Sequence, residues 1–154
     1  MYLLKWAHRP HHTSWLWSLP FVFLLAGCGP GEVRIEIAPE GNQLKYATQA
    51  FEVRAGQAVR LVMNNTATAA PMVHNVVILR SDADLDAVIN ASAGAADTGF
   101  IPDHPAIIAA TPTAQPGERT ETQFVAPAEV GEYPFVCLYP GHYFLMRGVM
   151  RVTP

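Results

Sequence analysis

Residues 133–152, YPFVCLYPGHYFLMRGVMRV, place two strand-like apolar runs on either side of a tight loop. Alternate residues of the first run share one face, which turns Cys137 toward the interior. Pro140-Gly141 supplies a turn, because proline fixes φ and glycine admits backbone angles that other residues avoid. A loop of this kind can place Cys137, His142 and Met146 around one point.

A second imidazole, His74, lies far upstream in the run His74–Leu79, which is nearly all apolar and typical of a strand covered on both sides. Two histidines, one cysteine and a weakly bound methionine form the ligand set of a blue-copper electron-transfer site. Thiolate and thioether suit the reduced ion, and imidazole suits both oxidation states. We therefore predict one copper ion bound by His74, Cys137, His142 and Met146.

Each of these residues also has a simpler interpretation. Cys137 could be an inert buried thiol and Met146 a core residue, since both types often fill protein interiors. A structural zinc site would normally use cysteine and histidine without methionine. A catalytic cysteine–histidine pair would need an orienting Asp or Asn, and the sequence places none beside this pair. His104, in the turn-like segment 102–105, is expected in solvent rather than as a fifth ligand. The complete ligand set favours copper.

The first residues predict export. A basic start at Lys5 and Arg9 precedes an apolar run over residues 15–25, which has signal-peptide length and is short for a transmembrane span. The run closes with Leu25-Ala26-Gly27-Cys28, which resembles the bacterial lipoprotein signal, in which the cysteine is acylated and becomes the new N-terminus. The alternative is an ordinary secretory signal with an incidental Cys28.

This interpretation divides the chain into a signal peptide (1–27), a short tether after a lipidated Cys28 (28–32) and one domain (33–154). The remaining chain has 8 basic and 13 acidic residues, a net charge of −5, which argues against nucleic-acid binding. Cys137 becomes the only unmodified thiol, so no intramolecular disulfide can form. The tether reaches at most about 17 Å when extended, which would hold the domain close to the membrane.

The rest of the chain alternates between short strand-like runs and turns. The strands expected from these patterns lie near residues 33–37, 51–53, 58–63, 74–79, 120–125, 133–137 and 148–152. Many short strands with regular turns suggest a β-sandwich or a Greek-key barrel. Residues 82–96 break the pattern with the helical spacing of Leu85, Val88 and Ile89, which Ser81 or Asp82 can cap. We expect this helical insert to pack on the flank as a lid or spacer.

The chain resembles the cupredoxins, the small blue-copper proteins, and among them the azurin and auracyanin type. The pattern Cys-x4-His-x3-Met over residues 137–146 matches the ligand loop of azurins, and Met72-x-His74-Asn75 matches their other ligand segment. The resemblance implies an all-β, eight-stranded Greek-key β-sandwich and an electron carrier rather than an enzyme. It also implies that Met146 is the axial ligand and that the two histidines and Cys137 are equatorial.

The resemblance extends to residues beside the ligands. It implies that Asn75 ties the two ligand loops together and supports hydrogen bonding to the cysteine sulfur, which tunes the potential. Azurins have glycine where this chain has Val73, and the carbonyl of that glycine approaches copper. Because Val73 could hold its carbonyl farther from the metal, the resemblance does not imply a fifth ligand here. The azurin disulfide is absent. With the lipid signal, these departures favour a membrane-tethered carrier over a soluble azurin.

We expect the protein to shuttle single electrons between redox partners outside the bacterial cytoplasm, such as cytochromes or membrane electron-transfer complexes. His142 would be the portal, and the residues expected to form an apolar patch around its ring are Met72, Tyr139, Pro140 and Phe144. A copper-handling lipoprotein is the alternative. A copper oxidase or nitrite reductase would need a second copper centre, and the sequence offers no further histidine cluster. A metal-free structural lipoprotein is the remaining possibility.

Overall fold

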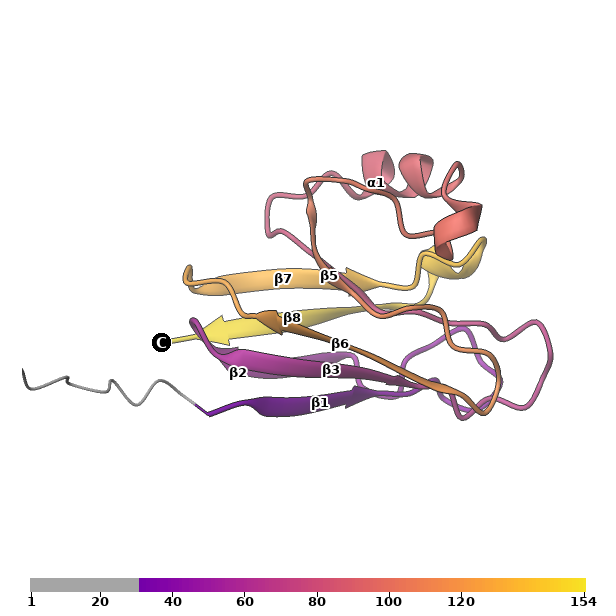
Figure 1. Ribbon diagram of the computed structural model, residues 1–154, viewed down its shortest axis with the longest axis horizontal. Helices are drawn as coiled ribbons and strands as arrows, with labels where there is room; N and C mark the ends of the chain where they lie inside the picture. The colour runs from indigo at the N-terminus through magenta and orange to yellow at the C-terminus, as the bar shows by residue number, and fades with distance from the viewer. Residues whose placement is uncertain (1–30) are drawn as a thin grey trace, which may run out of the picture.

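Two β-sheets pack face to face in the part of the chain that the computed structural model describes, residues 31–154 (Figure 1). The strands are β1 (Val33–Ile37), β2 (Ala50–Arg54), β3 (Ala58–Asn64), β4 (Val77–Leu79), β5 (Ile107–Ala110), β6 (Arg119–Val125), β7 (Gly131–Val136) and β8 (Arg147–Thr153). The prediction of an all-β, eight-stranded sandwich with a short helical insert is confirmed.

Both sheets mix parallel and antiparallel neighbours. The smaller sheet has the order β1-β3-β6, with β1 parallel and β6 antiparallel to β3. The larger sheet has the order β2-β8-β7-β4-β5, in which only β2 and β8 run parallel. Alternate residues of each strand point between the sheets, where large buried side chains such as Leu61, Met63 and Phe135 form the main core.

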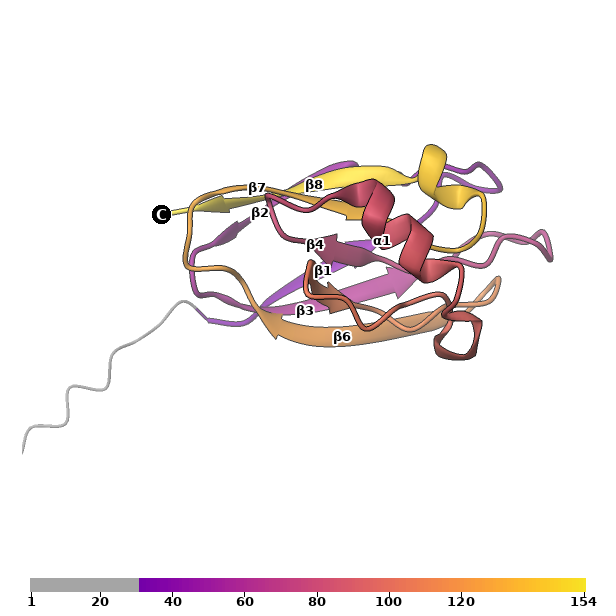
Figure 2. The same ribbon diagram turned by 90° about the horizontal axis from the view of Figure 1, so that it is seen from above.

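Strand β4 is covered on both faces, as its apolar run predicts. Ile78 belongs to the core between the sheets, whereas Val77 and Leu79 belong to a second buried cluster beneath the insert. Helix α1 (Leu85–Ser92) lies over this outer face of the larger sheet, with Val88 fully buried in the same cluster (Figure 2). The expected position of the insert on the flank of the sandwich is therefore confirmed.

The helix cap differs from the one expected. The Asp84 side chain accepts hydrogen bonds from the backbone N–H groups of Asp86 at 3.0 Å and Ala87 at 3.2 Å. Asp84 is thus the N-cap, and the expectation of Ser81 or Asp82 was wrong because three acidic residues within five positions all fit the cap pattern. A 3-10 turn, Ala96–Thr98, follows the helix. No helix within residues 31–154 has the length and apolar character that a membrane crossing requires.

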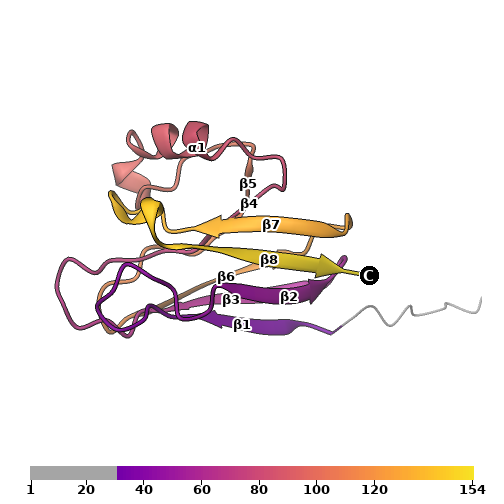
Figure 3. The same ribbon diagram turned by 180° about the vertical axis from the view of Figure 1, so that it is seen from behind.

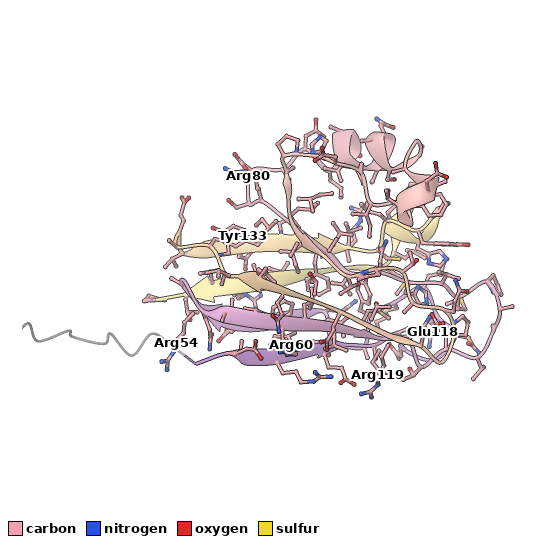
Figure 4. The ribbon with its side chains drawn as sticks, viewed as in Figure 1. Arg54, Arg60, Arg80, Glu118, Arg119 and Tyr133 are labelled. Atoms are coloured by element: carbon pink, nitrogen blue, oxygen red, sulfur yellow. The ribbon has the colours of Figure 1, made fainter. Side chains whose placement is uncertain are left out.

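The outer face of the smaller sheet is polar. Arg60, labelled in Figure 4, forms ion pairs with Glu32 at 3.1 Å and Glu121 at 2.7 Å, and Arg119 forms one with Glu36 at 3.3 Å. Exposed pairs of this kind each contribute about 0–1 kcal/mol to stability. The main effect of the network is therefore to make this face polar and suited to contact with solvent.

The two ends of the sandwich carry different features. Strand β1 begins at one end, and the 3-10 turn His142–Phe144 lies at the other (Figures 1 and 3). The predicted signal peptide (1–27) and lipidation site Cys28 lie outside the described residues. The described chain thus enters the domain at the end far from the predicted ligand loop.

Candidate metal centre

The loop between β7 and β8 closes on itself through its own backbone. The N–H of Cys137, directly after β7, donates to the carbonyl of Met146 at 3.0 Å, and the N–H of Met146 donates to the carbonyl of His142 at 2.9 Å. Gly141, with φ of 82°, makes the turn that begins the 3-10 segment. Because this φ is unfavourable for other residues, the glycine fixes the path that brings His142 back toward Cys137.

His74 reaches the same point from a different kind of segment. The expected strand 74–79 begins three residues later, at Val77, and His74 is held instead by an isolated bridge to Ala114. The N–H of His74 donates to the Ala114 carbonyl at 3.1 Å, and the N–H of Ala114 donates back at 2.7 Å. Asn65, also buried, donates through Nδ2 to the same Ala114 carbonyl at 2.9 Å and to the Met72 carbonyl at 2.7 Å. The backbone of His74 and the segment just before it are therefore both held by hydrogen bonds.

Three ligand atoms converge in the interior between these segments. The Nδ1 atoms of His74 and His142 lie 3.1 Å apart, and the Cys137 Sγ lies 4.0 Å from the first and 3.8 Å from the second. A transition metal bound about 2.0–2.1 Å from nitrogen and 2.3 Å from sulfur needs donor atoms roughly 3–4 Å apart. The spacing therefore fits one ion bound by all three residues.

Burial separates this centre from water. His74 and Cys137 have no exposed surface, and His142 is 7% exposed. Met146 is fully buried and belongs to the same core cluster as Cys137. Within residues 31–154 these two histidines and Cys137 are the only residues that bring three His, Cys, Asp or Glu ligand atoms together closely enough for an ion. The chain supplies one centre there, with donors that suit copper.

Burial also sets the protonation of the metal-free site. It raises the pKa of the Cys137 thiol to about 11, against the opposing effect of the Asn75 and Tyr139 backbone N–H groups and the Tyr46 hydroxyl. Burial, and then the nearby His142, lower the pKa of His74 to about 4, and burial lowers the pKa of His142. Near neutral pH the site therefore holds two neutral imidazoles and one protonated thiol.

This protonation state predicts how metal binding depends on pH. We expect Cu(II) binding at pH 8 to release about one proton per ion, because only the thiol must lose a proton to become a ligand. An indicator titration in weak buffer would measure the release, with Cys137→Ala as the control that releases almost none. Equal proton release by the native protein and the Cys137→Ala variant would contradict this assignment.

Asn75 connects the two ligand segments. Its Oδ1 accepts a hydrogen bond from the N–H of Leu138 at 2.8 Å, and its Nδ2 donates to the carbonyl of Gly99 at 3.2 Å. Its own backbone carbonyl accepts from the hydroxyl of the fully buried Tyr46 at 2.6 Å. Sequence reasoning found Asn75 but missed Gly99 and Tyr46, which lie 24 and 29 residues from it and belong to no local motif.

The surface beside His142 is apolar but differs in detail from the predicted patch. Phe144 is 67% exposed, Pro140 is exposed, and the half-buried Tyr139 places its ring centroid 5.0 Å from that of His142. Met72 is only 7% exposed, whereas Leu145, which was not predicted, is 66% exposed. An exposed apolar rim therefore adjoins the ligand that lies nearest to solvent.

Two further residues that the sequence singled out, Val73 and His104, can also be placed. Val73 is buried beside His74, and its N–H donates to the Pro71 carbonyl at 3.0 Å. His104 is half-buried outside the ligand cluster, and its Nδ1 accepts from the N–H of Ala106 at 3.2 Å.

Comparisons with known proteins agree with this geometry. The model of the family described as copper binding proteins, plastocyanin/azurin family, matches residues 33–153. Auracyanin-A of Chloroflexus aurantiacus is 37% identical over 128 residues, which cover 81% of this chain and 77% of that protein. The solved structure of auracyanin A, described as a "blue" copper protein, superposes with a TM-score of 0.72 at 34% identity and covers 80% of this chain and all of that one.

A second group of relatives carries a different name. Outer membrane protein H.8 of Neisseria meningitidis is 34% identical over 118 residues, which cover 73% of this chain. The match spans only 63% of the length of that protein. The similarity therefore covers only part of that protein.

Proposed function

Because the chain belongs to the plastocyanin/azurin family of copper-binding proteins, we propose that its type 1 copper centre would be held by His74, Cys137 and His142, with Met146 as a weaker fourth ligand. The protein is a type 1 blue-copper electron-transfer protein. The observation that carries the ligand assignment is the convergence of three buried donor atoms, 3.1–4.0 Å apart, from two distant segments.

The surrounding residues suit a centre that gains and loses electrons without rearranging. A bound copper ion supplies the one-electron couple. His74 is fixed by the Ala114 bridge, and Cys137 is fixed by the backbone of its own loop. Because close-packed interiors resist displacement, ligands held in this way would shift little when the charge of the site changes. The burial of the ligands also argues against a copper-transfer role, which needs donors that an acceptor can reach.

We further propose that electrons cross at the His142 end, where the apolar rim of Pro140, Phe144 and Leu145 meets solvent. Weak redox encounters use small interfaces, which permit rapid release. The ring of His142 would carry the electron between the buried centre and a partner seated on this rim. Electron transfer requires a donor and an acceptor, and cytochromes or membrane electron-transfer complexes are the proposed classes.

Phe144→Asp tests this surface. We expect the electron self-exchange rate, measured by NMR line broadening in mixtures of reduced and oxidised protein, to fall at least about tenfold. Loss of one buried aromatic contact removes roughly 1.5–3 kcal/mol, and like charges would then face each other across the encounter. Val125→Asp is a matched control, because Val125 is 65% exposed, against 67% for Phe144, but ends β6 on the far side. Equal rates in both variants would rule out this end as the portal.

The proposed arrangement includes a lipid anchor on Cys28 after removal of residues 1–27. The short tether (28–32) would leave the domain little freedom, since Gly31 already accepts a hydrogen bond from Gln57 at 3.0 Å and Glu32 pairs with Arg60. Because β1 begins at the end opposite the 3-10 turn His142–Phe144 (Figure 1), the redox surface would face away from the membrane. The outer membrane protein H.8 relatives support an extracytoplasmic, membrane-attached location.

Cys28→Ser tests the anchor. We expect the variant to move from the membrane fraction to the soluble extracytoplasmic fraction with an unchanged visible spectrum, because Cys28 takes no part in the copper site. Fractionation, together with the mass of the mature protein, would measure the change. A variant that remains in the membrane fraction would exclude Cys28 as the point of attachment.

A further inference from the structure

The turn that ends the insert contains an unusual backbone. Within the described part of the chain, Phe100 is the only residue other than glycine with a positive φ, at 63°, and it follows Gly99 at 67°. A left-handed conformation of this kind costs a bulky residue about 1–2 kcal/mol and persists only when its surroundings enforce it. The N–H of Phe100 donates to the Ala95 carbonyl at 2.7 Å, and the Thr98 hydroxyl donates to the Ile101 carbonyl at 2.7 Å. The turn is therefore held by its own hydrogen bonds.

The first residue of the turn contacts the link between the ligand segments. The Gly99 carbonyl accepts from Asn75 Nδ2 at 3.2 Å, while Asn75 Oδ1 accepts from the Leu138 N–H at 2.8 Å. A side-chain amide donates from one side and accepts from the other, so an acceptor at Gly99 selects the orientation in which the oxygen faces Leu138. Leu138 directly follows Cys137, so the Gly99 carbonyl acts on the thiolate segment through one intermediate residue.

The second residue of the turn contacts the other side of the loop. The Phe100 ring meets the Tyr139 ring edge-on, with centroids 5.3 Å apart and planes at 80°, and Tyr139 in turn packs on His142. Edge-to-face aromatic pairs contribute about 0.5–1.5 kcal/mol beyond the area they bury. The two residues of the turn therefore contact Asn75 and Tyr139, which in turn contact Leu138 and His142.

We propose that Gly99 and Phe100 are positioning residues of the copper centre, which hold the Asn75 amide and the Tyr139 ring in the arrangement that sets the reduction potential. The inference rests on the proposed copper ligands and assigns to the insert a part in tuning the site, beyond that of a spacer. Hydrogen-bond donors near the cysteine sulfur withdraw charge that would otherwise stabilise Cu(II). Loosening the turn would weaken these contacts and lower the potential.

Gly99→Ala tests the proposal. A Cβ on Gly99 would lie 3.1 Å from the Thr113 side chain, and the positive φ adds backbone strain. We expect the turn to shift in response and its hydrogen bond to Asn75 to lengthen. Gly56→Ala is the matched control, since its φ is +70° and a Cβ there meets nothing within 4 Å. We expect both variants to lose thermal stability, but only Gly99→Ala to lower the midpoint potential and shift the energy of the charge-transfer band. An unchanged potential and band in folded Gly99→Ala would overturn the proposal.

Substitutions at Phe100 distinguish the effect of the ring from that of the backbone. They also provide a second test if Gly99→Ala does not fold. Asparagine tolerates the left-handed conformation, so Phe100→Asn removes the ring with little backbone change, whereas Phe100→Tyr keeps it. We expect a lowered potential in Phe100→Asn and the native potential in Phe100→Tyr. Equal potentials in the native protein and Phe100→Asn would overturn the positioning role. Failure of the proposed ligands would appear separately, as a native protein without a copper chromophore.

Discussion

Cys137→Ser should abolish both the intense visible colour of the copper-loaded protein and its reversible one-electron couple. The colour of a type 1 site comes from charge transfer between a thiolate and Cu(II), and a serine oxygen cannot supply it. Serine is also a harder ligand that binds Cu(I) poorly, so the reduced state would lose its main source of stability. Absorption spectroscopy and voltammetry on the same samples would measure both losses.

His104→Ala is the control for this substitution. His104 is half-buried and lies outside the ligand cluster, so its loss should leave colour and couple unchanged. A serine variant that keeps the native colour would show that the chromophore does not depend on Cys137, and the ligand assignment would then be wrong.

Gly148→Ala should destabilise the domain more than any other single methyl addition at a described glycine. A Cβ on Gly148 would overlap the Phe135 ring at Cζ and lie 2.6 Å from the Gln49 carbonyl oxygen. Phe135 stands opposite Gly148 in the β7–β8 pair and packs on the rings of Tyr46 and Phe51, so it has little room to move. Overpacking of this kind typically lowers the free energy of unfolding by about 1–3 kcal/mol. We expect Gly148→Ala to lower it by at least about 3 kcal/mol.

Gly131→Ala provides the matched control in the neighbouring strand. A Cβ at Gly131 would meet only the Tyr133 ring, at 3.8 Å, which is an ordinary contact. Denaturant unfolding of the metal-free proteins should therefore show a much smaller change for Gly131→Ala. Similar free energies of unfolding for the two variants would contradict the packing described around Phe135.

The ligand loop was predictable because its information is local. Cys137, His142 and Met146 fall within ten residues, and their chemistry limits the ions they can bind. His74 stood out as a histidine beside an apolar run, and the structure brings it to the loop. Alternating or continuous apolar runs located seven of the strands, because burial on one face imposes a period of two and burial on both faces makes every residue apolar.

Other features escaped prediction because they depend on contacts between distant segments. Strand β5 has the sequence IIAA, which shows no alternation, and it is defined by pairing with β4. The bridge that holds His74 needs Ala114, 40 residues away, which has no chemical signature of its own. The orientation of Asn75 depends on Gly99 and Tyr46, and the strain at Phe100 arises from a turn that only the folded insert defines.

The central claim is that one copper ion is bound by two imidazoles and one thiolate from segments far apart in the sequence. Copper-edge X-ray absorption of the copper-loaded protein tests it most directly, because it detects bound sulfur and the outer-shell scattering of bound imidazole rings. We predict one short sulfur ligand and two imidazole rings, with the sulfur lost in Cys137→Ser and one ring lost in His74→Ala. A native spectrum without sulfur, or an unchanged number of imidazole rings in His74→Ala, would contradict the account.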